Sequence, residues 1–387
     1  RGEQVSAVWM VTAAVSVYCI AYRFYSLYIA KYVMQLDPNR LTPAERHNDG
    51  LDYVPTHKGV LFGHHFAAIA GAGPLVGPVL AAQMGYLPGT LWIIFGVVFA
   101  GAVQDMMVLF VSMRRDGKSL GDIVKQELGT VPGVIASIGI LMIMVIIMAV
   151  LALIVVKALV HSPWGTFTIA ATMPIALFMG IYTRYIRPGK IGEISIVGFI
   201  LLMLAVIYGD NVAHSSIGHW FDLDGIQLTW AIMIYGFVAS VLPVWLLLTP
   251  RDYLSTFLKI GTIVALAIGI LIVSPALQMP AVTHFIDGSG PVFSGALFPF
   301  LFITIACGAV SGFHALISSG TTPKMLENET HVRMIGYGGM LMESFVAIMA
   351  LAAAASLDPG VYFAMNSPAA LIGTDANTAA EVITTKL

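Results

Sequence analysis

Ten long apolar segments alternate with polar loops along the 387-residue chain. The uncharged run from residue 131 to 156 contains 26 residues, and a membrane-spanning helix needs only about 20. Strands of a membrane β-barrel are about ten residues long and alternate strictly between apolar and polar positions, which these segments do not. The pattern therefore predicts an all-α polytopic membrane protein with spanning helices near residues 5–30, 59–83, 88–112, 131–159, 165–183, 191–209, 228–248, 258–275, 294–320 and 335–356.

The composition agrees with a membrane protein and excludes other classes. Apolar residues make up 58% of the chain and charged residues 10%, with a mean hydropathy of +0.86. Soluble proteins average about 25% charged residues, so a water-soluble enzyme is excluded. The net charge of −2 and the lack of a basic run argue against a nucleic-acid partner. Cys19 and Cys307 both lie in apolar segments and predict no disulfide framework.

The distribution of basic residues predicts the orientation in the membrane. Cytoplasmic loops carry an excess of Lys and Arg, and alternate loops of this chain hold 15 of its 19 such residues. We assign Arg251 and Lys259 to one of these loops, and we expect the polar loop 31–58 to fold over the cytoplasmic face. Residues 1–356 then form the transmembrane domain. Residues 357–387 form a periplasmic tail or the start of a missing C-terminal part, and contain no complete element.

Two of the predicted helices contain residues that break a helix near the middle of the membrane. Unpaired backbone groups are costly in hydrocarbon, so broken helices persist only against protein or a water-filled cavity, and paired breaks indicate the binding site of a transporter. Close packing of helices through small residues is the alternative, and it stays open for both segments. The two segments run in opposite directions, as inverted repeats require, but they are seven helices apart rather than five. The break residues are Gly71, Gly73, Pro74, Gly77 and Pro78 in the second segment and Gly308, Ser311 and Gly312 in the ninth.

Five ionisable residues are predicted inside the membrane, roughly 8–12 Å from its cytoplasmic edge by the helical rise. Charged groups at such depth usually belong to ion or proton pathways, and histidine titrates near neutral pH. We therefore predict that they couple transport to protons, with hydrogen bonds in a packed core as the alternative. These residues are His64, His65, Asp105, His314 and Glu343.

The polar residues at the end of the ninth segment, Ser318, Ser319 and Thr321, are added to the break residues as candidates for substrate binding. A metal site formed by His64, His65, His314 and a carboxylate is conceivable only if the helix unwinds at the two adjacent histidines. No nucleotide-binding motif is present, which argues against a primary pump. We expect no metal and no other cofactor.

Several long motifs resemble the carbon starvation protein A family over essentially the whole chain. They include NDGLDYVPT, VLFGHHFAAIAGAGPLVGPVLAAQMGYLPG, GAVQDMMVLFVSMRRDG, PVWLLLTPRDYLSTFLKIG and FPFLFITIACGAVSGFHALISSGTTPKML. Members of that family are longer, and the chain resembles their N-terminal and central portion. The resemblance implies a bacterial inner-membrane transporter that takes up peptides during carbon starvation, with close relatives that import pyruvate with protons. It also implies the inverted-repeat core of the amino-acid, polyamine and cation transporters.

Together these observations predict a proton-coupled secondary active importer rather than an enzyme. Its substrate would be a small carboxylate-bearing nutrient, a peptide or pyruvate, bound between the two breaks. Its other partners would be protons and the lipid bilayer. A passive channel and an intramembrane metal-dependent hydrolase are the alternative functions.

Overall fold

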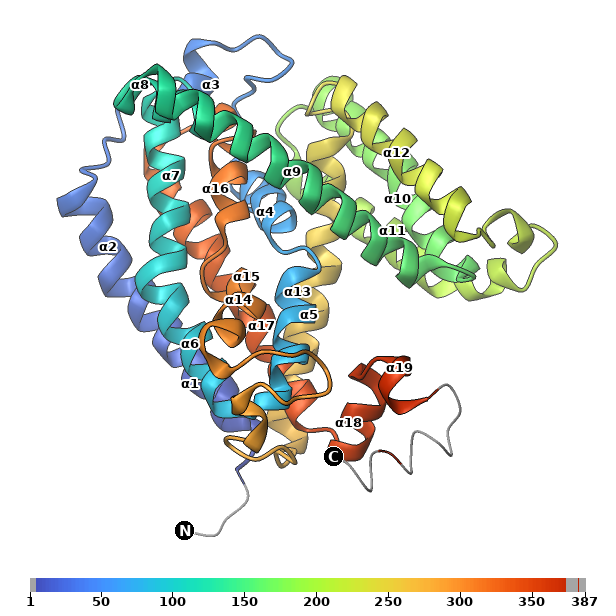
Figure 1. Cartoon of the computed structure of the whole chain (residues 1–387). Helices are drawn as coiled ribbons and strands as arrows, with labels where there is room; N and C mark the ends of the chain where they lie inside the picture. Colours follow the sequence, from blue (N-terminus) through green and yellow to red (C-terminus); the bar gives the residue numbers. More distant parts are fainter. Residues whose placement is uncertain (1–4, 374–381, 383–387) are drawn as a thin grey trace.

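Figure 1 shows the computed structural model of the chain, which describes residues 5–373 and residue 382. Seven of the described helices are long and apolar enough to cross a membrane, and an eighth span results if the bent pair α4–α5 counts as one. The prediction of an all-α polytopic membrane protein is confirmed. The seven long spans are Ala7–Val33, which contains α1 (Ala7–Ile20) and α2 (Ser26–Tyr28); Tyr86–Arg114, which contains α6 (Tyr86–Gly96) and α7 (Ala102–Arg114); Thr130–Leu159 (α9); Pro163–Ile186, which contains α10 (Pro163–Ile181); Ile191–Ala213 (α11); Leu248–Val273 (α13); and Glu329–Ala355, which contains α17 (Gly339–Ala355).

Shorter helices complete the described part of the chain. The β-pairing in the described residues consists of two isolated bridges, one between Ser6 and Ala276 and one between Thr56 and Leu326. The shorter helices are α3 (Pro43–Arg46), α4 (Lys58–Ile69), α5 (Gly73–Ala81), α8 (Leu120–Leu128), α12 (Gly225–Val241), α14 (Phe302–Thr304), α15 (Ala306–Ala309), α16 (Gly312–Ser318), α18 (Pro359–Asn366) and α19 (Ala369–Ile372).

Three predicted segments differ from the helices that form. The seventh becomes α12, which has 17 residues and stops before Pro243. The ninth is divided into short pieces from the π-helical turn Leu297–Leu301 to α16. The eighth starts at Leu248 rather than at 258, because residues 248–257, several of which are polar, are helical as well. Arg251 and Lys259 are therefore residues of α13, and assigning them to a loop is wrong.

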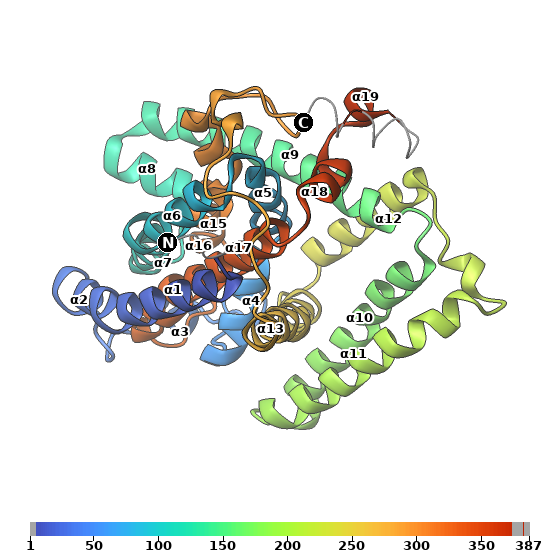
Figure 2. The same ribbon diagram turned by 90° about the horizontal axis from the view of Figure 1, so that it is seen from below.

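The core of the bundle is formed around α17, most of whose residues are buried. In Figure 1, α1, α4–α5, α6–α7, α13 and the broken ninth segment surround it. The helices α10, α11 and α12 project to one side in both views, and α9 crosses from α8 towards them (Figure 2). No residue in the most apolar window of α9 is buried. The helices that hold the buried ionisable side chains are thus in the core, while α9 to α12 lie at its edge.

The loop 31–58 folds back over one end of the bundle, where α3 and α8 lie (Figure 1); that this end faces the cytoplasm stays a prediction. Its residues Val54 and Thr56 donate backbone hydrogen bonds to the carbonyl oxygens of Lys324 and Met325. Arg46 forms an ion pair with Asp116 at 2.7 Å. Within the loop, N–H groups of Leu51 and Tyr53 donate to the Asp49 carboxylate and lower its pKa. The loop is therefore an ordered cover over this end.

The expectation that residues 357–387 contain no complete element is wrong for its first part. Asp358 caps α18 by accepting the N–H of Gly360 at 2.9 Å. The Tyr362 hydroxyl donates to the carbonyl oxygens of Val79 and Leu80, which ties α18 to the end of α5. Residues 374–381 and 383–387 lie outside the described part.

Candidate functional site

The break in the second predicted span lies between α4 and α5, which are bent by 45°. Residues 70–72 separate the two helices, and Gly71 donates its N–H to Ile69 rather than to a residue four positions back. The break therefore precedes both prolines. Pro74 lies in the first turn of α5. Residues of the first turn do not donate hydrogen bonds within the helix, so proline is tolerated there. Pro78 is inside the helix. The break thus lies at the start of the predicted range, at Gly71, and the prolines follow it.

The second break lies in the ninth segment, where Val310 and Ser311 take extended conformations between α15 and α16. The two broken segments run in opposite directions in Figure 1, with α15 beside α5 and α16 beside α4. A cavity of about 280 Å³ lies between them and is closed on one side by α9. It is lined by Ala68, Ile69, Gly71, Gly73, Cys307, Ser311 and Phe313 from the broken segments and by Ile146, Ile147, Val150 and Leu151 from α9.

Backbone donors without a partner in the described chain lie at the start of α5, where Gly73 is part of the cavity wall. Among the described residues, the N–H groups of Ala72 and Gly73 donate to no backbone carbonyl. The first N–H groups of a helix lack partners within it and form the positive end of its dipole. An anion bound in the cavity would meet these groups, which is the chemistry that a substrate carboxylate requires.

The candidate glycines divide into two groups according to what a side chain would meet. At Gly71 and Gly312 an added Cβ atom would find no atom within 4 Å. At Gly73 it would lie 2.6 Å from Cys307 Sγ, and at Gly77 and Gly308 it would overlap Thr304 O and Ala347 Cβ. Close packing of the helices therefore depends on three of these glycines, Gly73, Gly77 and Gly308, which agrees with the alternative of small residues at helix contacts. Gly71 instead faces open space at the cavity.

A buried group of titratable residues lies next to the cavity. His314 of α16 has its Nδ1 atom 2.9 Å from Asp105 Oδ2 of α7 and its Nε2 atom 2.9 Å from Glu343 Oε2 of α17. All three side chains have 0% relative exposure. His314 and Asp105 form a hydrogen bond with favourable angles. His314 and Glu343 are within ion-pair distance, but the angles are not those of a hydrogen bond. One imidazole thus lies between two carboxylates from two other helices.

Cys307 and Ser311 connect this network to the cavity. Both line the cavity. The Cys307 Sγ atom donates to Glu343 Oε1 at 3.2 Å, and the Ser311 carbonyl accepts a hydrogen bond from Gln104, the neighbour of Asp105, at 2.6 Å. The cavity wall is therefore one hydrogen bond from Glu343, through Cys307, and reaches the residue before Asp105, through Ser311. Sequence reasoning did not select Cys307 as a site residue.

The structure does not bring all five predicted ionisable residues into one network. His64 lies between Asp252 Oδ2, at 2.9 Å from Nδ1, and Thr321 Oγ1, at 3.1 Å from Nε2. His65 contacts Thr322 Oγ1 at 3.0 Å. The two adjacent histidines therefore join α4 to the end of the ninth segment and are separate from the group of Asp105, His314 and Glu343.

The remaining candidates for substrate binding do not line the cavity. Ser319 donates within its own helix to Ala315 O at 2.7 Å, and Thr321 contacts His64. The Ser318 hydroxyl is buried without a hydrogen-bond partner among the described residues. The residues selected from the sequence that do line the cavity are Gly71, Gly73 and Ser311, whereas Pro74, Gly77, Gly308, Gly312, Ser318, Ser319 and Thr321 lie outside its wall.

The histidine cluster that would have bound a metal is not formed, because His64 and His65 have the partners described above. Another group has suitable donors: one atom each of Cys307, His314 and Glu343 lie within 4.8 Å of one another. Thiolate, imidazole and carboxylate are the ligands that zinc takes in proteins. These atoms also contact each other at 2.9–3.9 Å, as members of a hydrogen-bonded network do.

Sequence reasoning missed a row of polar residues on α13 that faces α4. Asp252 contacts His64, and the Thr256 hydroxyl donates to Gly63 O at 2.8 Å. The Lys259 ammonium donates to Ala67 O and Ala70 O, each at 2.8 Å. Spacings of four and three residues place these side chains on one face of a helix. The spacing was available in the sequence, but the helix was taken to begin after Asp252 and Thr256.

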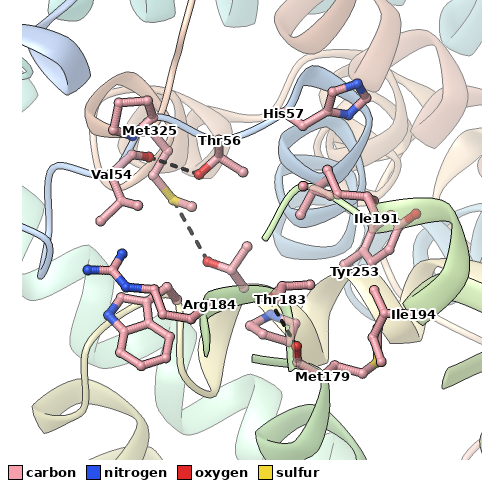
Figure 3. Close-up of a pocket in the computed structure, with 16 residues that line it drawn as sticks. Val54, Thr56, His57, Met179, Thr183, Arg184, Ile191, Ile194, Tyr253 and Met325 are labelled. Carbon is pink, nitrogen blue, oxygen red and sulfur yellow. Dashed lines mark hydrogen bonds between the residues drawn. The ribbon is translucent and has the colours of Figure 1, made fainter. Parts of the chain in front are cut away.

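A second cavity, of about 330 Å³, lies beneath the loop 31–58 (Figure 3). It is lined by residues 54–57, by Met179, Thr183 and Arg184 near the end of the α10 span, and by Ile191, Ile194 and Tyr253 among others. Its charged or ionisable groups, His57 and Arg184, are exposed, and Arg184 lies over the Trp245 ring at 5.0 Å. It shares no lining residue with the cavity between the breaks. We therefore take the latter, which adjoins the buried network, as the candidate site.

Comparison with known proteins agrees with the resemblance of the motifs. Residues 6–386 match the family described as "Carbon starvation protein CstA". This chain belongs to that family. It is 70% identical to the "Peptide transporter CstA" of Escherichia coli (strain K12) over 96% of the chain and 53% of that protein. It is 66% identical to the "Pyruvate/proton symporter BtsT" of the same strain, over 96% of the chain and 52% of that protein.

A third relative is the "Peptide transporter CstA" of Campylobacter jejuni, which is 63% identical over 99% of the chain and 55% of that protein. The chain thus spans about half the length of the curated relatives it matches. No solved structure matches the chain. The relatives are named as transporters, and the multi-pass helical architecture agrees with that class.

Proposed function

We propose that this chain is part of a secondary active transporter that imports small carboxylate-bearing nutrients together with protons. The observation that supports this most strongly is the cavity between two broken helices, because its wall residue Cys307 is bonded to Glu343 of the buried acid–histidine network and its wall residue Ser311 is bonded to Gln104, the chain neighbour of Asp105. A binding site and a titratable network in contact are what coupling requires, because occupation of one must alter the protonation of the other. Breaks in two antiparallel segments are typical of transporters with inverted repeats, which remain a prediction.

The substrate class follows from the free donors at the start of α5. Ala72 and Gly73 offer N–H groups and a positive helix end to an anion, and the rest of the cavity wall is mostly apolar. A carboxylate carried on a small organic group fits both features. Peptides and pyruvate share this group, and relatives at 70% and 66% identity are named for peptide transport and for pyruvate/proton symport.

Competition for uptake tests this assignment. The full-length protein, reconstituted in liposomes and driven by an inward proton gradient, should accumulate labelled pyruvate or a labelled dipeptide. Unlabelled pyruvate or dialanine should compete, whereas pyruvamide and dialanine amide, which lack the carboxylate, should compete at least ten-fold less well. Equal competition by acids and amides would contradict carboxylate recognition at α5.

We propose that the protein lies in the inner membrane of a bacterium and that its basic loops face the cytoplasm. Ser119 and Ser289 are both exposed and lie in loops at opposite ends of the bundle. In a cysteine-free variant, Ser289→Cys should react with an impermeant maleimide on intact cells, and Ser119→Cys only after permeabilisation. Reaction of Ser119→Cys on intact cells would contradict this orientation.

The two alternative functions predict different measurements. A passive channel would equilibrate the substrate without accumulating it, whatever the proton gradient. A metal-dependent hydrolase would retain near-stoichiometric zinc after purification, held by Cys307, His314 and Glu343. Accumulation above the external concentration excludes the channel, and substoichiometric zinc in an active preparation excludes the hydrolase.

A further inference from the structure

Lys259 places an ammonium group at the break between α4 and α5. Its Nζ atom donates hydrogen bonds to the carbonyl oxygens of Ala67 and Ala70, each at 2.8 Å. Ala67 lies in the last turn of α4, and Ala70 is the residue that ends this helix. The last carbonyls of a helix have no partner within it and carry a partial negative charge. The ammonium therefore occupies the position at which a free cation would bind to this helix end.

The ammonium is bound by carbonyl oxygens rather than by an acid. Within the described ranges, no carboxylate oxygen lies within 4 Å of Lys259 Nζ, and Asp252 on the same face of α13 is paired with His64 instead. Lysines in membrane helices usually extend to the interface or pair with an acidic group. Lys259 does neither, and its surroundings are those of a cation site formed by backbone oxygens.

The neighbouring contacts keep the ammonium in this place. Thr256, three residues before Lys259, donates to Gly63 O, and Asp252 contacts His64, so residues 252–259 of α13 are bonded to residues 63–70. The ammonium cannot leave the two carbonyls by a movement of α13 as a whole unless these contacts break too. Its charge is thus positioned by the packing of the two helices.

We propose that Lys259 is a tethered cation, which fills a monovalent-cation site formed by the carbonyl oxygens of Ala67 and Ala70 and excludes Na⁺ from it. In transporters with broken helices, unwound carbonyls and the C-terminal ends of half-helices bind Na⁺ or protons. Here the chain supplies the positive charge itself. Lys259 thereby determines which ion the transporter uses; this consequence rests on the proposed function, whereas the cation site does not.

Chemical rescue tests the site in the purified full-length protein. Lys259→Ala removes the Cγ, Cδ, Cε and Nζ atoms, which are the heavy atoms of propylammonium. The variant should lose about 2–4 °C of melting temperature, because two helix-end carbonyls lose their donor. Propylammonium at 100 mM should restore at least half of this loss, and Na⁺ a smaller part. Tetramethylammonium, which has the same charge but no N–H, should restore none. Lys157→Ala is the matched control, since Lys157 is an exposed lysine of α9, and it should respond to none of these cations.

A wild-type melting temperature in Lys259→Ala, or equal effects of propylammonium and tetramethylammonium, would overturn the proposal. If Lys259→Ala is recovered only in the presence of an amine, the yield of monodisperse protein prepared with each cation gives the same comparison. Uptake by the wild type should be the same in Na⁺ and in choline, and a requirement for Na⁺ would also overturn it. Because the melting experiment uses no substrate, it decides the site even if the proposed transport is not observed.

Discussion

Replacing His314 with Gln is expected to abolish proton-driven accumulation of substrate. The imidazole lies between Asp105 and Glu343, 2.9 Å from an oxygen of each. Glutamine can donate to one of these carboxylates, but it does not titrate and cannot pass a proton between them. Uptake under an inward proton gradient should fall to the level of equilibration, while exchange of labelled for unlabelled substrate across the membrane should persist. The measurement is uptake and exchange in the same liposomes.

A second variant and a control separate coupling from folding. Asp105→Asn keeps the shape of the side chain and its contact with His314, and we expect the same loss of accumulation with retained exchange. His219→Gln removes an exposed histidine outside the bundle and should leave both activities at the wild-type level. Normal accumulation in both His314→Gln and Asp105→Asn would mean that the buried network is only a structural element.

Gly77→Ala is expected to destabilise the protein strongly, although alanine is the better helix former. A Cβ atom at this position would overlap the carbonyl oxygen of Thr304 and lie 3.4 Å from Ile305 Cα, so the backbone of the ninth segment must move. Overpacking of this kind costs about 1–3 kcal/mol, which in a chain of 387 residues corresponds to a fall in melting temperature of about 1–4 °C. Thermal unfolding of the purified variant measures it.

Gly71→Ala is the matched substitution on the other side of the break. Its Cβ atom would meet nothing within 4 Å, and Gly71 lines the cavity. We expect a wild-type melting temperature with weaker substrate binding, because the methyl group enters the space beside the free N–H groups. Loss of stability at Gly71 with unchanged affinity, or no loss at Gly77, would contradict the division of the glycines into packing and cavity positions.

The hydrophobic pattern predicts most of the spans because the bilayer requires long apolar helices whatever their packing. It fails where a helix begins with polar residues that are satisfied inside the protein. The first turns of α13 contain Arg251 and Asp252, and the contact of Asp252 with His64 makes this position tolerable in the membrane. Hydropathy cannot detect such a partner, since it depends on which helix lies opposite. The error moved the predicted start of the helix by ten residues and left Arg251 in a loop.

The position of the break shows a similar limit. Proline is tolerated in the first turn of a helix, so the proline-containing sequence starts α5 instead of interrupting it. Among the ionisable residues, the helical rise gives a common depth but does not say which face of each helix turns to which neighbour. Packing therefore separates His64 and His65 from Asp105, His314 and Glu343. Packing also brings Cys307 into contact with Glu343. Nothing in the sequence indicated this contact, because a cysteine in an apolar segment is usually a core residue.

The central claim is that substrate binding at the breaks and proton movement through His314 are one coupled process. Liposomes that contain the full-length protein and an internal pH indicator test it directly. With no gradient imposed and the membrane potential clamped, addition of external substrate should acidify the interior as substrate enters, and His314→Gln should abolish this acidification. Substrate entry without acidification in the wild type, or equal acidification in His314→Gln, would contradict the claim.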